Sequence, residues 1–271
     1  MTSRPRFLLA SDLDGTLIPP EDSARSRKAV SEFTEAAQAA RPGLSLAYVT
    51  GRDLALALEG ISTWGLPAPD FLACDVGTSV YRRDAGSFVK DGAYAALMHE
   101  ALGRIESAEV LRLTRDVAGV RPQPQEKQGA HKASFFFPWP ERKSAEAEVA
   151  RRLEEAGVRG DLVVSRDAVT GEGLLDVVPA GGAKDRAVLY LAETLGLPLE
   201  AVVFAGDSGN DRTALLCGAR AVLVGNASDH VRSGLLEEAR SRGVDDRLYL
   251  AEGEVADGVI EGLVHWGVVT P

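Results

Sequence analysis

The sequence has little cysteine and no long apolar run, and each shortage excludes a class of protein. Its two cysteines, Cys74 and Cys217, lie far apart in apolar stretches, so they provide neither a disulfide framework nor the paired spacing of a zinc site. The apolar run that follows Arg4 and Arg6 spans only residues 7–10, which is too short for the core of a signal peptide, and no membrane-spanning stretch follows it. We therefore expect a soluble, cytoplasmic protein.

The chain also has fewer basic than acidic residues. The chain has 30 lysines and arginines against 40 aspartates and glutamates, which gives a formal net charge of −10. A surface of this sign argues against nucleic acid or an anionic membrane as the main partner, and a small anionic ligand would need cations gathered locally. With 271 residues, of which 45% are hydrophobic, the chain can fill one large core or two smaller ones.

Short apolar runs alternate with helical patterns in the first third of the chain and again near its C-terminus. The predicted strands cover residues 7–11, 44–50, 71–76, 201–205, 221–224 and 248–251. This order predicts an α/β fold, a doubly wound, Rossmann-like parallel sheet with helices on both faces. We assign residues 1–83 and 175–271 to this core domain.

The intervening stretch, residues 84–174, has a different order of predicted helices and strands. A helical pattern over residues 94–116 precedes extended segments at 120–125 and 132–137, and a second one over 143–156 precedes extended segments at 162–166 and 173–178. Two α-β-β units in succession predict a small antiparallel sheet with two helices on one face. We therefore expect an inserted α+β cap domain.

Two aspartates follow the first predicted strand, in the string FLLASDLDGTL. Asp12 and Asp14 project to the same side of an extended chain, where their charges repel each other unless a cation lies between them. A lone Asp-x-Asp is more often a solvated loop. The interpretation therefore depends on what lies at the ends of the other strands.

Polar clusters follow other elements at the same edge of the predicted sheet, where open α/β sheets bind ligands. They comprise Thr50, Gly51, Lys184, Asp207, Asn210 and Asp211. Taken singly, such residues also serve as helix caps or solvated side chains. Together they suit a magnesium ion and a phosphoryl group, because Asp12 and Asp207 offer hard oxygen ligands while Thr50 and Lys184 offer a hydroxyl and a positive charge.

The strings DLDGT, TGR at residues 50–52, Lys184 and GDSGND at residues 206–211 resemble, in order, the four motifs of the haloacid dehalogenase superfamily of phosphohydrolases. The insertion after the third strand resembles the α/β cap of one group in that superfamily. The stretches LAYVTGR, GDSGND and PQPQEKQGAHKASFFF are most similar to sucrose-6-phosphate phosphatase and its bacterial relatives. Where those enzymes tend to carry a basic residue just before the strand that leaves the cap, this chain has Gly171-Glu172-Gly173.

The resemblance implies a role for each matching core residue. Asp12 would be the nucleophile that forms an aspartyl-phosphate, and Asp14 would be the general acid and base. Mg²⁺ would be held by Asp12, Asp207 and the backbone carbonyl of Asp14, with Asp211 orienting these ligands from behind. The phosphoryl oxygens would be bound by Thr50, Gly51 and Lys184, with Asn210 in support.

The resemblance also implies that the cap chooses the substrate. The residues placed where related enzymes contact sugar hydroxyls are Glu126, Gln128, His131 and Lys132. A solvated hairpin tip is the alternative for this segment, and Trp139 either stacks on a sugar or packs at a strand edge. The expected function is a magnesium-dependent phosphatase for a sugar phosphate or a phosphorylated glycoside similar to sucrose 6-phosphate. A sugar phosphomutase and a non-catalytic carbohydrate-sensing module are the alternatives, and we expect a monomer, with a dimer as the alternative state.

Overall fold

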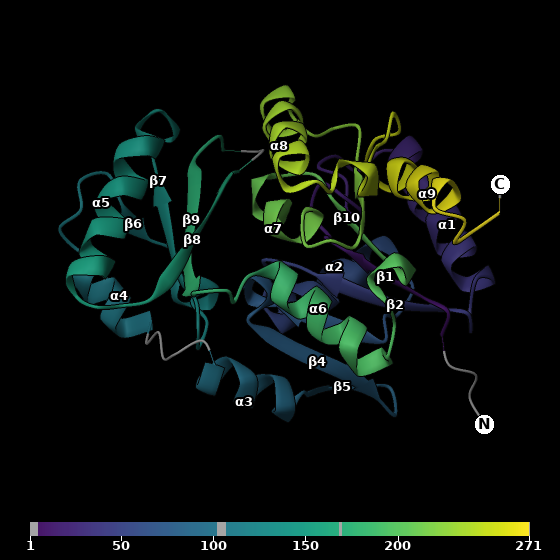
Figure 1. Ribbon diagram of the computed structural model, residues 1–271, viewed down its shortest axis with the longest axis horizontal. Helices are drawn as coiled ribbons and strands as arrows, with labels where there is room; N and C mark the ends of the chain where they lie inside the picture. Colours follow the sequence, from purple (N-terminus) through teal and green to yellow (C-terminus); the bar gives the residue numbers. More distant parts are fainter. Residues whose placement is uncertain (1–4, 102–106, 168–169, 271) are drawn as a thin grey trace.

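The computed structural model describes residues 5–101, 107–167 and 170–270. Two sheets organise this part of the chain and lie side by side in Figure 1. The large sheet has the strand order β12-β11-β10-β1-β2-β3-β4-β5. Its strands are β1 (Phe7–Ser11), β2 (Leu44–Val49), β3 (Phe71–Cys74), β4 (Ser79–Asp84), β5 (Ser87–Lys90), β10 (Val202–Gly206), β11 (Arg220–Leu223) and β12 (Leu248–Leu250).

The large sheet is parallel from β12 to β3 and ends in an antiparallel hairpin, β4 and β5. From the central β1, the chain proceeds outward through β2 and β3, and later in the opposite direction through β10, β11 and β12. The direction therefore reverses between β1 and β10, and the crevice beyond their carboxyl ends is where doubly wound sheets bind ligands. The predicted α/β fold is confirmed.

Helices cover both faces of the large sheet. One face is covered by α1 (Ala24–Ala39), α2 (Leu54–Trp64) and α9 (Val255–His265), and the other by α3 (Gly92–Ala101), α6 (Lys184–Leu195), α7 (Arg212–Leu215) and α8 (Asp229–Arg242). All six residues of β2 are buried, as expected for an inner parallel strand that is covered on both faces. Among the described residues, no helix has the length and apolar character needed to cross a membrane.

The small sheet is antiparallel, with the strand order β6-β7-β9-β8. Its elements are α4 (Ser107–Thr114), β6 (Arg121–Pro122), β7 (Ala133–Phe137), α5 (Arg142–Glu155), β8 (Gly160–Arg166) and β9 (Gly173–Pro179). Val110 of α4 and Val149 of α5 pack against Phe135 and Leu175 in one apolar cluster. Both helices therefore cover one face of the sheet, and the predicted repeat of α-β-β units is present.

The two sheets divide the chain at points other than the predicted limits of residues 84 and 174. Strand β5 lies in the large sheet, and α3 buries Tyr94 and Met98 in the core of that sheet. Strand β9 remains in the small sheet as far as Pro179. The physical reason is that the apolar side chains of α3 are buried against the large sheet rather than in the cap.

The single helical pattern predicted over residues 94–116 is represented by α3 and α4, and residues 102–106 between them lie outside the described part of the chain. We propose that the cap domain comprises residues 107–179 and that the remaining chain forms the core domain. This division assigns each described strand to the domain whose sheet contains it.

Candidate active site

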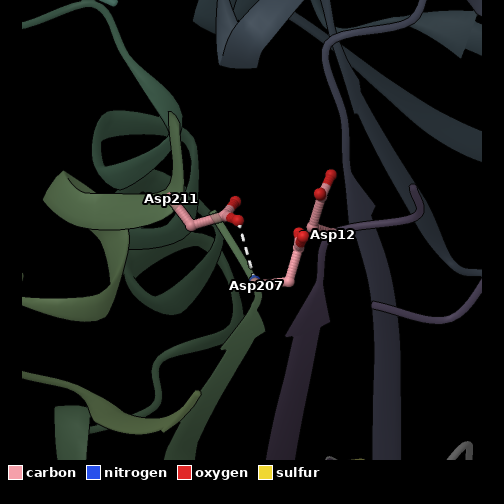
Figure 2. Close-up of side chains that lie close together, drawn as sticks. All are labelled: Asp12, Asp207 and Asp211. Atoms are coloured by element: carbon pink, nitrogen blue, oxygen red, sulfur yellow. Dashed lines mark hydrogen bonds between the residues drawn. The ribbon is translucent and has the colours of Figure 1, made fainter. Parts of the chain in front are cut away.

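Three aspartates meet where the direction of the large sheet reverses. Asp12 follows β1, Asp207 follows β10, and Asp211 lies in the 3₁₀ turn η5 (Gly209–Asp211). One carboxylate oxygen from each lies within 4.8 Å of the others, and Figure 2 shows Asp12 and Asp207 at the ends of neighbouring strands with Asp211 on the helical turn beside them. The structure thus brings together Asp12, from the end of one strand, and Asp207 and Asp211, which both follow another.

Two glycines permit this close approach. Gly15 has φ 78°, and a Cβ atom at this position would lie 2.5 Å from Oδ2 of Asp207. A Cβ atom at Gly206 would lie 2.6 Å from Cγ of Asp211. Any side chain at these positions would therefore displace the aspartates, and the left-handed φ of Gly15 is itself unfavourable for other residues.

Lys184, at the start of α6, lies between two of the aspartates. Its Nζ is 2.7 Å from Oδ1 of Asp12 and 2.7 Å from Oδ1 of Asp211, and it also donates to Oδ1 of Asn210 at 3.3 Å. The lysine is fully buried. Burial lowers its pKa, but the two carboxylates outweigh that effect, so the pKa lies above its ordinary value and Lys184 carries a positive charge.

Asp211 has partners on both carboxylate oxygens. Oδ1 contacts Lys184, and Oδ2 accepts hydrogen bonds from the backbone N–H groups of Asp207 at 3.0 Å and Ser208 at 3.1 Å. The first of these N–H contacts is the dashed line in Figure 2. Asp211 therefore orients the turn that carries Asp207, and this arrangement fits a supporting position behind the ligands of a metal.

The charges in this cluster do not balance. Three carboxylates face one ammonium group, so with every group ionised the carboxylates are in excess by two charges. Burial raises the pKa of Asp12 to about 7, because the loss of water and the charges of Asp211 and Asp14 outweigh the attraction of Lys184. Burial and neighbouring carboxylates also raise the pKa of Asp207 well above its usual range. A divalent cation with a preference for oxygen would compensate this negative charge, so the residues present fit such a metal.

Asp14 points to a different partner from Asp12. Its carboxylate accepts two hydrogen bonds from Arg52, at 2.8 Å from Nε and 2.6 Å from Nη2, and its side chain is 53% exposed. The sequence assigned no role to Arg52 beyond its place in the TGR string. The contact between Arg52 and Asp14 could have been anticipated only from the pairing of β1 with β2. These parallel strands are neighbours, so the residues that follow them lie side by side.

The loop after β2 is held from two sides. Thr50 is buried, and its backbone C=O accepts a hydrogen bond from the N–H of Val76 at 3.0 Å. Val76 and Asp75 have φ values of 61° and 54°, which are strained for residues other than glycine and are typical of functional sites. From the cap, Lys132 donates to the backbone C=O of Gly51 at 3.1 Å and lies 3.9 Å from Oδ1 of Asp75. The sequence missed Asp75, because its backbone conformation leaves no local pattern.

The remaining cap residues predicted to bind sugar lie in varied surroundings. Gln128 donates to the backbone C=O groups of Gln123 and Ser134, both at 2.9 Å, and accepts from the N–H of Ser134 at 2.8 Å. Its amide group is therefore used by the cap itself. Glu126 is exposed on the 3₁₀ turn η2 (Gln125–Lys127), whereas His131 is partly buried with no hydrogen-bond partner at Nδ1. Burial and nearby positive groups lower the pKa of His131.

A doubly wound sheet with an inserted cap and an aspartate-rich site at the reversal point defines a phosphohydrolase of the haloacid dehalogenase type. Residues 5–267 match the model of one family within that class, sucrose-6F-phosphate phosphohydrolase. The chain belongs to this family, and it is a phosphatase. The predicted resemblance is confirmed.

Comparisons with individual proteins agree with this assignment. The chain is 35% identical to a putative HAD-like hydrolase of Nitrosococcus oceani, over 96% of this chain and 72% of the relative. It is 30% identical to the mannosylfructose-phosphate phosphatase of Agrobacterium fabrum, over 98% of each protein. The fold matches the sucrose-phosphatase of Synechocystis sp., solved with sucrose and phosphate, with a TM-score of 0.80 and 24% identity over 97% of this chain and 98% of that one.

Proposed function

We propose that this protein hydrolyses a phosphorylated glycoside or a related sugar phosphate through an aspartyl-phosphate on Asp12, with Mg²⁺ as cofactor. The observation that supports this best is the buried Asp12 carboxylate, with one oxygen beside Lys184 and with Asp207 across the reversal point. The names of the relatives, among them the mannosylfructose-phosphate phosphatase, support a sugar-based substrate. Monomeric state and cytoplasmic location stay predictions.

Asp12 would act as the nucleophile. Lys184 contacts Oδ1, so the carboxylate is held in one orientation and the second oxygen is available to attack phosphorus. Attack in line with the ester oxygen forms the acyl-phosphate bond and breaks the bond to the sugar, which divides one difficult hydrolysis into two steps. Lys184 also favours the ionised form of Asp12, which nucleophilic attack requires.

Asp14 would move the protons. It would donate a proton to the leaving sugar oxygen and then accept one from the water that hydrolyses the aspartyl-phosphate. The two hydrogen bonds from Arg52 orient the Asp14 carboxylate, and its exposure leaves it accessible to a ligand above the strand ends. Arg52 is therefore a positioning residue in this proposal.

Asp12, Asp207 and the backbone C=O of Asp14 would hold the magnesium ion, with Asp211 in support. Bound Mg²⁺ would neutralise part of the charge on the phosphoryl oxygens. Thr50, the N–H of Gly51, Lys184 and Asn210 would donate hydrogen bonds or positive charge to the same oxygens. Lys184 and Asn210 already touch each other, so this group is partly assembled before a substrate binds.

The cap would close the site. Lys132 joins the cap to the loop after β2, so the two domains are in contact next to the phosphoryl-binding residues. Closure of the cap over this edge of the sheet would exclude water from the reaction. Contact of Glu126, Gln128, His131 and Lys132 with sugar hydroxyls stays a prediction, and the existing hydrogen bonds of Gln128 and Lys132 would have to rearrange for it.

A phosphate-release screen tests the proposal. The panel contains sucrose 6-phosphate, trehalose 6-phosphate, a mannosylfructose phosphate, fructose 6-phosphate and glucose 6-phosphate, each with Mg²⁺ and with chelator. We expect magnesium-dependent release of inorganic phosphate from at least one sugar phosphate, and an acid-quenched Asp14→Asn variant should carry the phosphoryl group on Asp12. Release from none of them contradicts the proposal, and isomerisation of the sugar phosphate without release identifies a phosphomutase instead.

A further inference from the structure

The turn η1 (Asp75–Gly77), which follows β3, has a strained backbone. Its residues Asp75, Val76 and Gly77 have φ values of 54°, 61° and 93°. Only glycine adopts such values without strain, and a β-branched residue such as Val76 is among the least suited to them. A strained conformation of this kind persists only where the surrounding contacts impose it. The contacts of η1 therefore indicate its role.

The first contacts of η1 are with the loop after β2. The N–H of Asp75 donates to the backbone C=O of Arg52 at 2.9 Å, and the N–H of Val76 donates to that of Thr50 at 3.0 Å. These two hydrogen bonds lie on either side of Gly51 in the sequence. Thr50 and Gly51 bind the phosphoryl oxygens in the proposed function, so η1 holds the backbone of a phosphoryl-binding segment.

The second contact of η1 is with the start of α6. A Cβ atom at Gly77 would lie 2.9 Å from Cα of Lys184 and 2.9 Å from the backbone oxygen of Ala183, so a larger residue would displace this backbone. The C=O of Gly77 accepts a hydrogen bond of 2.6 Å from the buried hydroxyl of Tyr94. The same turn thus touches both the loop after β2 and the lysine that contacts Asp12.

The side chain of Val76 explains why a valine occupies this strained position. It is 1% exposed and lies in an apolar cluster with Val163 of β8, Val178 of β9 and Ala183. Two of these partners belong to the cap sheet, and the third precedes α6. Glycine or asparagine would adopt the backbone of η1 with less strain, but neither has an apolar side chain to fill this space.

We propose that Val76 is a positioning residue for phosphoryl transfer. Its side chain, packed between the cap strands and the start of α6, holds η1 in its left-handed conformation. The turn in its place holds Thr50 and Lys184 in the arrangement that the reaction at Asp12 requires. This inference rests on the proposed function, because the phosphoryl-binding roles of Thr50 and Lys184 belong to it. Val76 acts through these residues and has no reacting atom of its own.

Three substitutions separate the side chain of Val76 from its backbone. Val76→Ala removes the apolar contacts and keeps the strain, Val76→Gly removes both, and Val76→Ile keeps a branched apolar side chain. Because glycine tolerates a positive φ, Val76→Gly should be at least as stable in urea as Val76→Ala. If activity followed stability alone, Val76→Gly would also be the more active of the two.

The activity of these variants is measured with p-nitrophenyl phosphate and with a sugar phosphate that the wild type hydrolyses, at a temperature where every variant is folded. We expect kcat to fall about 10- to 100-fold in both Val76→Ala and Val76→Gly, because a displacement of about 1 Å at a reaction site can cost about 100-fold in rate. Val76→Ile should retain most of the activity. The generic ester should be affected as strongly as the sugar phosphate, since both carry the same phosphoryl group.

Two controls match the two parts of the change. Val149→Ala also truncates a fully buried valine, but in a separate apolar cluster of the cap, so it should lower stability and leave kcat unchanged. Ala85→Gly relieves a φ of 45° in the exposed turn between β4 and β5, and it too should leave kcat unchanged. Wild-type kcat in both Val76→Ala and Val76→Gly, or an equal fall in Val149→Ala, overturns the inference and leaves the proposed function intact.

A measurement without turnover separates failure of the inference from failure of the proposed function. Hydrogen exchange of the backbone amides in peptides that contain residues 50–52 or residue 184 reports how firmly η1 holds these segments. We expect exchange at least about threefold faster in Val76→Ala than in the wild type, and no such change in Val149→Ala. If the wild type hydrolyses no phosphate ester, the proposed function fails and faster exchange still supports the positioning role. Unchanged exchange in Val76→Ala overturns that role whether or not the wild type is active.

Discussion

The core site and the cap segment 126–132 are both rich in polar side chains, but they use them in opposite ways. In the core, Asp12, Lys184 and Asp211 are buried, and Lys184 contacts both aspartates, which lie on other elements of the core. In the cap segment, Gln128 bonds to the backbone of its own hairpin, and Glu126 is exposed. The core side chains thus contact one another across distant elements, whereas Gln128 bonds within its own hairpin and Lys132 links the segment to the core backbone.

The largest effect is expected from Asp12→Asn. Asparagine is nearly isosteric but a poor nucleophile, so turnover should fall by at least about 10³-fold while the fold is retained. Circular dichroism and a phosphate-release assay measure the two properties. A variant that still releases phosphate near the wild-type rate would show that the core site does not act through Asp12.

Removal of the metal should also abolish turnover, as Asp12→Asn does. Chelation should abolish turnover, Mg²⁺ should restore it, and Ca²⁺ should inhibit, because calcium accepts more ligands in a looser shell and misaligns the Asp12 carboxylate. Mg²⁺ at about 100 times its dissociation constant should also raise the free energy of unfolding by about 2.7 kcal/mol. Full activity in excess chelator, or no change in stability, would remove the metal from the proposal.

Lys184→Met tests the buried charges themselves. The substitution leaves Asp12 and Asp211 without their common cation, and breaking a buried ion pair in this way costs about 3–5 kcal/mol of unfolding free energy. Urea denaturation measures the loss. The matched control is Lys28→Met, in an exposed pair with Glu32, where we expect little change. Equal stability of the two variants would mean that the core network contributes no more than a surface pair.

The smallest expected effects are those of substitutions in the cap segment 126–132. Gln128→Ala removes a side chain that forms three hydrogen bonds with the cap backbone, so the free energy of unfolding should fall by about 1–3 kcal/mol. Glu126→Ala, at an exposed position, should leave stability within about 0.5 kcal/mol of the wild type. If Gln128→Ala raises KM for sugar phosphates without lowering stability, Gln128 contacts the sugar as the sequence predicted.

Much of the fold was predictable because the inner strands are mostly apolar. Strands β1, β2, β3 and β10 are buried on both faces, so short apolar runs in the sequence mark them directly. Helix α3 shows where this approach fails. Its pattern reveals a helix, but whether Tyr94 and Met98 pack on the large sheet or on the cap depends on contacts with distant strands. The domain limits that we propose differ from the predicted ones for this reason.

The sequence by itself determined the order of the elements and predicted which polar side chains lie at the carboxyl edge of the large sheet, because a doubly wound sheet brings the carboxyl ends of its strands together. Asp12, Lys184 and Asp207 follow from that rule. Only the tertiary structure decided that Arg52 pairs with Asp14 and that Lys132 reaches the backbone of the loop after β2. These bonds join segments far apart in the chain, and their distances depend on how the two sheets pack, which no local pattern of residues encodes.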